Sequence, residues 1–270
     1  MSNAFTRPPA HFGVGWLRPL AYNLAPVITN VSIAVETSSR AGGLALGIDR
    51  RLRKTADFQA AARHATQLVG QMDRLLNDAG LAPKDLTEVY VSAGPGSFTG
   101  LRVGVTVART LGQVIAGLRC VAVPTPLAVA ENAADLDWQR LGVVMDARAG
   151  CVHATLFHRE QGRIAILTEP MVCSPAEFLR RCGRPILLIG EGLGYHDLTG
   201  KGVRMAFPDQ PDRHVPTVEA VWNAGSQLAK EGQFSDYRLL LPIYAREPEA
   251  VRLWPQQQHR PDGRPAARKT

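Results

Sequence analysis

The sequence predicts an α/β protein built from two duplicated lobes that face each other. Residues 33–47 and 143–157 share one layout: a hydrophobic strand ends on an acid, Glu36 or Asp146, and a short polar turn leads into a second strand. In both halves, apolar strand-like runs then alternate with amphipathic helical segments, which is the pattern of sheets covered by helices. This layout is that of a duplicated α/β fold with a cleft between its lobes.

Hydrophobic periodicity places the elements of each lobe. In the first lobe, residues 30–134, we expect strands at 31–35, 44–48, 52–58, 88–93 and 119–123, and helices at 63–79, 100–116 and 126–134. In the second lobe, residues 135–254, we expect strands at 141–145, 151–157, 163–167 and 185–189, helices at 175–182 and 216–230, and a last strand or extended segment at 239–244. The helix at 63–79 presents one apolar face, made of Leu68, Val69, Met72, Leu75, Leu76 and Ala79.

Composition fits a globular, cytoplasmic chain. Of the 270 residues, 45% are hydrophobic and 20% are charged. No apolar run reaches the roughly 18 residues of a membrane span. The four cysteines show neither C-x-x-C nor zinc-type spacing, so we expect reduced thiols.

The net charge of +7 is concentrated at the two ends of the chain. Residues 1–30 contribute +2 and residues 255–270 contribute +3, which leaves +2 for the part between them. A nearly neutral body argues against direct nucleic-acid binding through counterion release. We expect an irregular, proline-interrupted leader at 1–29 and a disordered basic tail at 255–270.

The loop from Val91 to Gly104 reads V-S-A-G-P-G-S-F-T-G-L-R-V-G. An apolar strand runs into a sharp turn, and Ser97 or Thr99 can cap the helix that follows. Because the start of a helix attracts anions, the loop and the two strand-ending acids are candidates to face an anion or nucleotide. Those candidates are Glu36, Thr37, Gly94, Gly96, Ser97, Thr99, Arg102 and Asp146. The pattern is neither a Walker A loop nor G-x-G-x-x-G.

Small residues recur every four positions along the helix that follows this loop, at Gly100, Gly104, Ala108, Gly112 and Ala116. Positions four apart share a helix face, so the stripe lets another backbone approach closely. Two interpretations stay open at this stage. The stripe lies either on the protein's own sheet or against a helix of another chain.

The remaining polar candidates are weaker. Glu36 and Asp146 either hold a magnesium ion and orient a water or cap the turns at their strand ends. Arg102 serves an interface, a bound anion or solvent, and His64 reads as a helix-entry residue. Ser97 has no evident His and Asp partners for a nucleophile, and the short G-E-G at 190–192 is the only further hint of a nucleotide site.

With these segments in view, the chain resembles the TsaB (YeaZ-like) family, which has the actin-like ATPase (ASKHA, ribonuclease H-like) fold and acts in forming threonylcarbamoyladenosine in tRNA. The family motif G-P-G-S-F-T-G-[LVI]-R-[IV]-G is unbroken from Gly94 to Gly104. Residues 34–38, 146–150 and 242–250 match its A-x-[ED]-T-S, D-A-R-x-G and P-x-Y-x-R-x-P-E-A patterns. Cys151 and His153 depart from it, since many relatives have Glu and Tyr at these two places.

The related TsaD-type catalytic proteins hold a metal partly through H-x-x-x-H soon after the small-residue helix. Here Thr125 and Val129 stand at these two places, and the seven histidines include no pair at this spacing. Two imidazoles four residues apart can grip one ion, whereas a threonine and a valine cannot. We therefore expect neither a metal site nor catalytic residues on this chain.

The resemblance implies a non-catalytic partner subunit of a TsaD-like transferase that modifies adenosine 37 of tRNA. It implies docking through the helices at 63–79 and 100–116, a further TsaE-like ATPase, tRNA engaged only through the complex, and ATP or ADP with magnesium at the complex rather than on this chain. A homodimer through the same face is a further implied state. The candidate interface residues are His64, Leu68, Met72, Leu75, Gly100, Leu101, Gly104, Ala108 and Gly112.

Two alternatives belong to another class of protein. An actin-like-fold ATPase or small-molecule kinase acting on its own would use Glu36, Asp146 and the loop at 94–100, and it predicts ATP binding and turnover by the purified chain. A peptidase would need a nucleophile set, and the sequence shows no complete one.

Overall fold

The computed structural model describes residues 28–59 and 64–244. The predicted leader at 1–29 therefore lies almost wholly outside the described residues, and so do the basic tail and the second half of the motif at 242–250. No helix in the described part is long and apolar enough to cross a membrane.

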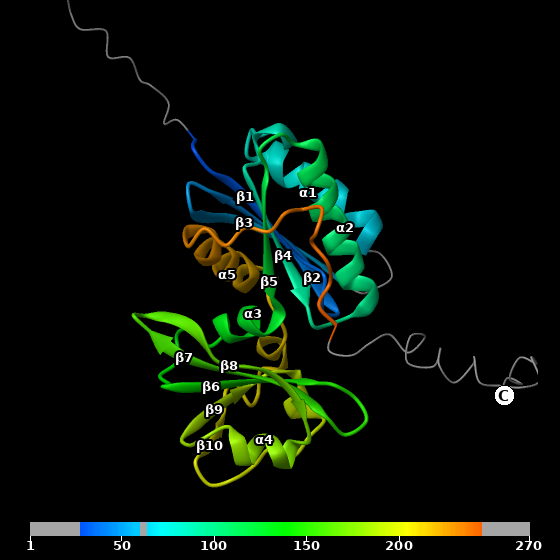
Figure 1. The fold of residues 1–270 in the computed structure, drawn as a ribbon. Coiled ribbons are helices and arrows are strands. Elements are labelled where there is room, and N and C mark those ends of the chain that lie inside the picture. Colours follow the sequence, from blue (N-terminus) through cyan, green and yellow to red (C-terminus); the bar gives the residue numbers. More distant parts are fainter. Residues whose placement is uncertain (1–27, 60–63, 245–270) are drawn as a thin grey trace, which may run out of the picture.

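Two five-stranded sheets form the centres of the two lobes (Figure 1). The first has the order β3-β2-β1-β4-β5. Its strands are β1 (Val31–Glu36), β2 (Ala41–Ile48), β3 (Arg51–Gln59), β4 (Glu88–Gly94) and β5 (Arg119–Pro124). β1 pairs antiparallel with β2 and parallel with β4, and β4 pairs parallel with β5.

The second sheet repeats this topology in the order β10-β9-β6-β7-β8. Its strands are β6 (Arg140–Asp146), β7 (Val152–Glu160), β8 (Arg163–Cys173), β9 (Ile186–Ile189) and β10 (Val203–Met205). β6 pairs antiparallel with β7 and parallel with β9, as β1 does with β2 and β4. The equivalent strands β4 and β9 also both run into a glycine with positive φ, Gly94 at 117° and Gly190 at 122°. The predicted duplicated α/β fold is confirmed.

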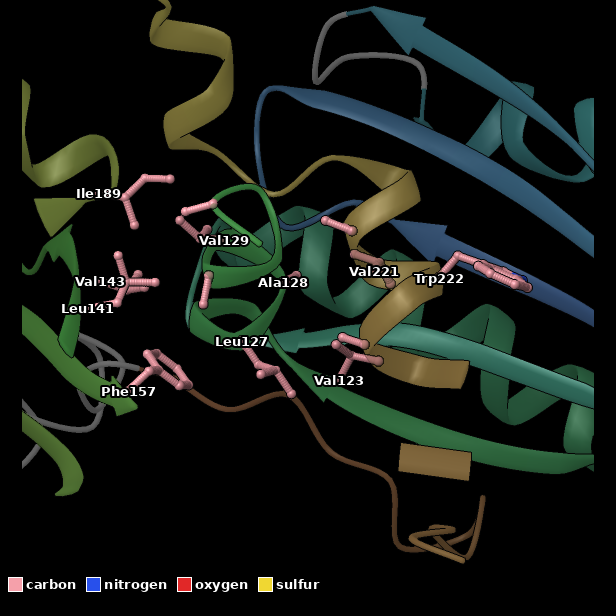
Figure 2. Packing of buried hydrophobic residues seen from close by; sticks show 14 of the residues in the cluster. Val123, Leu127, Ala128, Val129, Leu141, Val143, Phe157, Ile189, Val221 and Trp222 are labelled. Atoms are coloured by element: carbon pink, nitrogen blue, oxygen red, sulfur yellow. The ribbon is translucent and has the colours of Figure 1, made fainter. Parts of the chain in front are cut away.

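Helices cover both faces of the first sheet. On one face, α1 (His64–Asp78) and α2 (Phe98–Val114) pack on Ile33, Val35 and Leu44. On the other face lie α3 (Thr125–Glu131) and α5 (Val218–Lys230). The apolar side chains of α3 and α5 form one continuous cluster with residues of the second sheet, so the two lobes share a core (Figure 2). The short helix α4 (Pro175–Arg181) covers the far face of the second sheet.

The predicted boundary between the lobes needs a correction at its carboxyl end. We expected residues 135–254 to form the second lobe, but α5 packs on the first sheet, where the indole of Trp222 donates to Ser32 Oγ at 3.1 Å. Further along, Ser235 pairs with Cys120 of β5, and the amide of Ile243 donates to the Ala93 carbonyl at 2.6 Å. The chain therefore crosses back to the first lobe after the second sheet is complete.

Several elements differ from the sequence prediction in extent. β8 continues to Cys173 rather than ending at Leu167, because an edge strand tolerates Pro170 and the polar residues before it. The segment at 239–244 forms no strand: Leu239 ends a turn, with its amide bonded to the Asp236 carbonyl, and residues 240–244 have no regular secondary structure. α2 ends at Val114, so Ala116 lies outside the helix. The residues of the predicted apolar face of α1 are buried except for two. Val69 is 62% exposed, and Ala79 is exposed and lies beyond the end of the helix.

Candidate functional site: the cleft between the lobes

The strand ends of both sheets meet at a cavity of about 360 Å³ between the lobes. The first lobe lines it with the turn after β1 and the G-P-G turn at the start of α2. The second lobe lines it with the ends of β6 and β7 and with the 3-10 helix η2 (Glu191–Gly194). α3 contributes Thr125 and Val129. Strand ends and helix starts thus gather polar groups in one place, as the duplicated topology requires.

Glu36 ends β1 and is 1% exposed, behind the wall of this cavity rather than in it. Its Oε1 accepts from the backbone amide of Ser38 at 2.6 Å, from Ser38 Oγ at 2.8 Å and from the amide of Ser39 at 3.1 Å. Its Oε2 has no hydrogen-bond partner among the described residues. Burial raises the pKa of Glu36 from 4.5 to about 7, against the opposing effect of these hydrogen bonds.

Asp146 ends β6 and lines the cavity, with its side chain 27% exposed. Its Oδ1 accepts from the amide of Arg148 at 3.1 Å and from His196 Nε2 at 3.0 Å. Its own amide donates to Glu191 Oε1 at 3.0 Å, and burial raises the pKa of Glu191. Both strand-ending acids therefore cap their own turns, as one of the two interpretations expected. The described residues include no group of three acids, histidines or cysteines that could hold a metal ion.

The amino end of α2 reaches the cavity through Gly96 and Ser97. Ser97 is the N-cap: its Oγ accepts from the amide of Gly100 at 3.3 Å. The amide of Ser97 donates to the Ser38 carbonyl at 2.7 Å, so the G-P-G turn rests on the turn after β1. The alternative cap, Thr99, lies two residues further on, inside the helix, and is exposed.

Only part of the predicted anion-facing set reaches the cleft. Gly96, Ser97 and Asp146 line it. Thr37 is fully buried under α2, and Gly94 packs against the backbone of Ile243. Thr99 and Arg102 line hollows on the outer side of α2, where the Arg102 guanidinium lies 5.4 Å from the centre of the Phe98 ring. For these last four residues the prediction is corrected: helix packing directs them away from the cleft.

The small-residue stripe lies on the protein's own chain. A Cβ at Gly100 would sit 1.8 Å from the Thr37 carbonyl oxygen, and one at Gly104 would sit 2.4 Å from Thr37 Oγ1. A Cβ at Gly112 would meet Tyr237 at 2.7 Å. The interpretation that the stripe packs on another chain's helix is therefore wrong, because the turn after β1 and the C-terminal segment already fill it.

The same burial corrects the predicted interface residues. Leu68, Met72, Leu75, Leu101 and Ala108 are all at most 6% exposed within their own core. Gly100 and Gly104 are buried as well, and nothing is described for the side chain of His64. The outward face of α2 instead carries Arg102, Val103, Thr106 and Thr110. Apolar residues at helical spacing mark the face of a helix that packs on a core, and in α1 and α2 that core is the chain's own.

Several cleft residues had no functional role in the sequence prediction. Arg40 and Arg148 stand at the rim, and Tyr195 and His214 complete the second lobe's wall. His214 Nδ1 accepts from the Gly190 amide at 3.1 Å while its Nε2 lies 3.0 Å from the Phe207 carbonyl, an arrangement that requires the neutral tautomer protonated on Nε2. Thr125 and Val129 line the cavity together, and their four-residue spacing was the signal that could have placed them there.

The geometry defines the class of protein first: a two-lobed α/β chain of duplicated topology, with a cleft between the lobes but no metal-ligating set among its described residues. A family model described as "TsaD: tRNA N6-adenosine threonylcarbamoyltransferase" matches residues 58–211, more than half of the chain. The chain belongs to the TsaB (YeaZ-like) family, which is related to these transferases.

Individual relatives agree with this assignment. The chain is 28% identical to the tRNA threonylcarbamoyladenosine biosynthesis protein TsaB of Bacillus subtilis, over 82% of this chain and 96% of that protein. It is 25% identical to the TsaB of Escherichia coli, over 83% and 97% of the two chains. Among solved structures, YeaZ from Pseudomonas aeruginosa superposes with a TM-score of 0.67 at 22% identity, covering 80% of this chain and 99% of that one.

Proposed function

We propose that this chain is a non-catalytic partner subunit of a TsaD-type transferase in the formation of N6-threonylcarbamoyladenosine at position 37 of tRNA. The observation that carries the proposal is the chemistry of α3. Thr125 and Val129 line the cleft where an H-x-x-x-H pair would place two metal ligands, and neither side chain ligates a transition metal well. Membership of the TsaB family supports the same role.

The outward faces of α1 and α2 are the docking surface in this proposal. A hollow of about 390 Å³ on α2 is lined by Thr99, Arg102, Val103, Thr106 and Val107. A second hollow, of about 320 Å³, lies between α2 and the C-terminal segment, where Phe98 stacks on Tyr244 with ring centres 5.1 Å apart. A contiguous exposed apolar patch is typical of an interaction site, and Phe98, beside these hollows, is 47% exposed.

The other members of the complex follow from the family. A TsaE-like ATPase, ATP or ADP with magnesium at the complex, and tRNA held through the complex are partners of the assembly rather than ligands of this chain alone. A homodimer through the same α2 face is the state we propose when the transferase is absent. The cytoplasm is the compartment that this role requires.

Thr106 lies between the two hollows and tests the docking surface directly. We expect Thr106→Trp to weaken binding to the TsaD-type protein of the same organism at least about tenfold, because a bulky ring blocks close approach of two helices. Calorimetric titration of the two purified proteins measures it. The matched control is Ala176→Trp, at an exposed position of α4 in the second lobe. Unchanged binding of Thr106→Trp would refute this surface.

The alternative of an independent ATPase or kinase is tested with the chain alone. We expect no ATP turnover in the presence of magnesium, because Asp146 and Glu191 are engaged in hydrogen bonds that cap the β6 turn. A phosphate-release assay checks this. Sustained hydrolysis that Asp146→Asn abolishes would contradict the non-catalytic role.

A further inference from the structure

We propose that the far end of the second lobe binds the phosphate backbone of RNA through a patch of cations, which we call the distal basic surface. It consists of Arg140, Arg180, Arg181, Arg184, Lys201 and Arg204. The RNA is the tRNA of the proposed function, and the choice of RNA rests on that function. The surface supplies a weak contact of this chain, which adds to the contacts that the transferase makes.

The nearly neutral charge of the middle of the chain conceals an uneven distribution. Residues 180–184 and 200–204 hold five cations and no acid. The parallel pairing of β10 with β9 brings the two segments together, since Val203 lies opposite Ile186. β6 runs parallel to β9 on its other side and starts at Arg140. The cations therefore gather where three parallel strands begin.

The distal basic surface lies apart from the cleft and from the docking face. β6 and β9 end at the opposite side of their sheet, where Asp146 and Glu191 line the cleft. Figure 1 shows α4 and β10 in the lower lobe and α1 and α2 in the upper one. The surface thus stays accessible when a partner covers the outward face of α2.

Backbone contacts hold two of the arginine side chains in place. The Arg184 guanidinium donates to the Lys201 carbonyl, and the Arg204 guanidinium donates to the Asp137 carbonyl at 3.1 Å. A guanidinium has five N–H donors, so one such bond positions the group and leaves other donors for an external acceptor. Arg184, Lys201 and Arg204 are all exposed.

Two of the guanidinium groups lie around one buried thiol. Arg140 lies against Gly183, where an added Cβ would meet its guanidinium. Burial raises the pKa of the Cys182 thiol, and the positive charges of Arg184 and Arg140 oppose that rise. Positive charge is therefore concentrated over the short segment that joins α4 to β9.

The distal basic surface lacks the acidic partners that balance the other dense basic run of the chain, residues 50–54. There, Arg50 pairs with the buried Glu88 at 2.8 Å. In the distal basic surface, only Arg181 pairs with a carboxylate of the described residues, that of Glu177 at 3.2 Å. Cations held close together without acids repel one another, and a polyanion relieves this repulsion.

The side chains of the surface favour a nucleic acid over a protein partner. Protein interfaces have an apolar centre. Segments 180–184 and 200–204 expose no apolar side chain, since Cys182 is buried and Val203 is partly buried. Phosphate binding needs positive charge, and arginine can offer a phosphate two parallel N–H donors. Five of the six cations are arginines.

Fluorescence anisotropy of a labelled, unmodified tRNA transcript tests the surface with the full chain. At about 50 mM salt we expect a Kd of about 1–100 µM, the range of sequence-independent phosphate contacts. The triple variant Arg184→Gln, Lys201→Gln, Arg204→Gln should weaken binding at least about tenfold. It should also reduce the slope of log K against log salt by about two to three, because up to three phosphate contacts are lost.

The matched control is the triple variant Arg51→Gln, Arg53→Gln, Lys84→Gln, which removes the same charge from exposed positions of the first lobe. The terminal segments are the same in all three proteins, so binding by their basic residues cancels in the comparison. Equal losses in the two triple variants, or no loss in the first, would overturn the proposal.

Photo-crosslinking of the unmodified chain to a tRNA transcript that contains 4-thiouridine does not depend on how a variant folds. We expect crosslinks to peptides that cover 180–184 or 200–204, and crosslinks confined to other segments would contradict the proposal. Polyglutamate and phosphatidylserine vesicles represent an acidic protein and a membrane. If the distal triple variant loses affinity for either of them but not for tRNA, RNA is the wrong occupant.

Calorimetric titration with the TsaD-type protein separates this inference from the proposed function. We expect the distal triple variant to bind that protein as the wild type does, because the surface is distant from α2. A wild-type chain that binds tRNA through this surface but does not bind the transferase would refute the partner role and leave the RNA contact standing. A chain that binds the transferase but shows no contribution of this surface to tRNA binding refutes the RNA contact alone.

Discussion

Glu36 and Asp146 occupy equivalent places at the ends of β1 and β6, yet their surroundings differ. After β4 the first lobe continues into α2, a helix of 17 residues whose Gly100 and Gly104 lie on the turn that follows Glu36. After the equivalent strand β9, the second lobe has only the four-residue η2. Glu36 is therefore sealed at 1% exposure, while the side chain of Asp146 keeps 27% and pairs with His196. The exposure of each acid is therefore set by the element that covers the strand end, and not by the strand itself.

The contact between α2 and the turn after β1 is the feature whose loss should cost most. Gly100→Ala places a Cβ 1.8 Å from the Thr37 carbonyl oxygen, so helix and turn must separate. We expect the free energy of unfolding to fall by about 3 kcal/mol or more, the upper range for overpacking a rigid site. Urea unfolding measures it.

Gly70→Ala provides the matched control for this substitution. Gly70 lies inside α1 with no atom within 4 Å of an added Cβ. We expect it to stabilise the chain by about 0.5–1 kcal/mol through helix propensity alone. Equal effects of the two substitutions would show that α2 does not press on the turn.

The sealing of Glu36 predicts a pH dependence of stability. The pKa of Glu36 is about 7 in the folded chain and 4.5 in the unfolded chain. Between these two pH values, the carboxyl group therefore keeps its proton in the folded state and has lost it in the unfolded state. Stability therefore falls as pH rises through this window, and the loss is complete above pH 7. By pH 8 it amounts to about 3 kcal/mol.

Glu36→Gln removes the ionisation and keeps an acceptor for the Ser38 amide. We expect the variant to be more stable than the wild type at pH 8, with a much smaller difference at pH 5, in urea unfolding at both values. Glu160→Gln, at an exposed position on β7, controls for the lost charge. A difference of the same size at both pH values would refute a buried, protonated Glu36.

Asp146 should matter least to stability. Asp146→Ala removes acceptors for the Arg148 amide and His196 Nε2, and solvent replaces them in part because the site is open to the cavity. We expect a loss of about 1 kcal/mol. Thermal unfolding measures it, and a loss as large as that of Gly100→Ala would mean that the second turn is as tightly sealed as the first.

The sequence was most informative where a pattern is local. Periodicity placed nine of the ten strands of the two sheets and missed only the short edge strand β10. The likeness of residues 33–47 to residues 143–157 predicted the duplicated topology that the sheet orders confirm. Ser97 was one of the two N-cap candidates that the sequence offered, and the structure selects it over Thr99. The positions of the seven histidines in the sequence already showed that no two of them are four residues apart.

The tertiary structure decided which side of each element faces what. Periodicity identified the smooth face of α2 but not its partner, because a backbone distant in sequence and a helix of another chain satisfy the same stripe of small residues. Only the fold shows that Thr37 fills it, that α5 returns to the first lobe, and that Thr125 and His153 line the same cleft. A pattern along the chain records that a surface is buried or polar; which surface covers it depends on contacts between segments far apart in sequence.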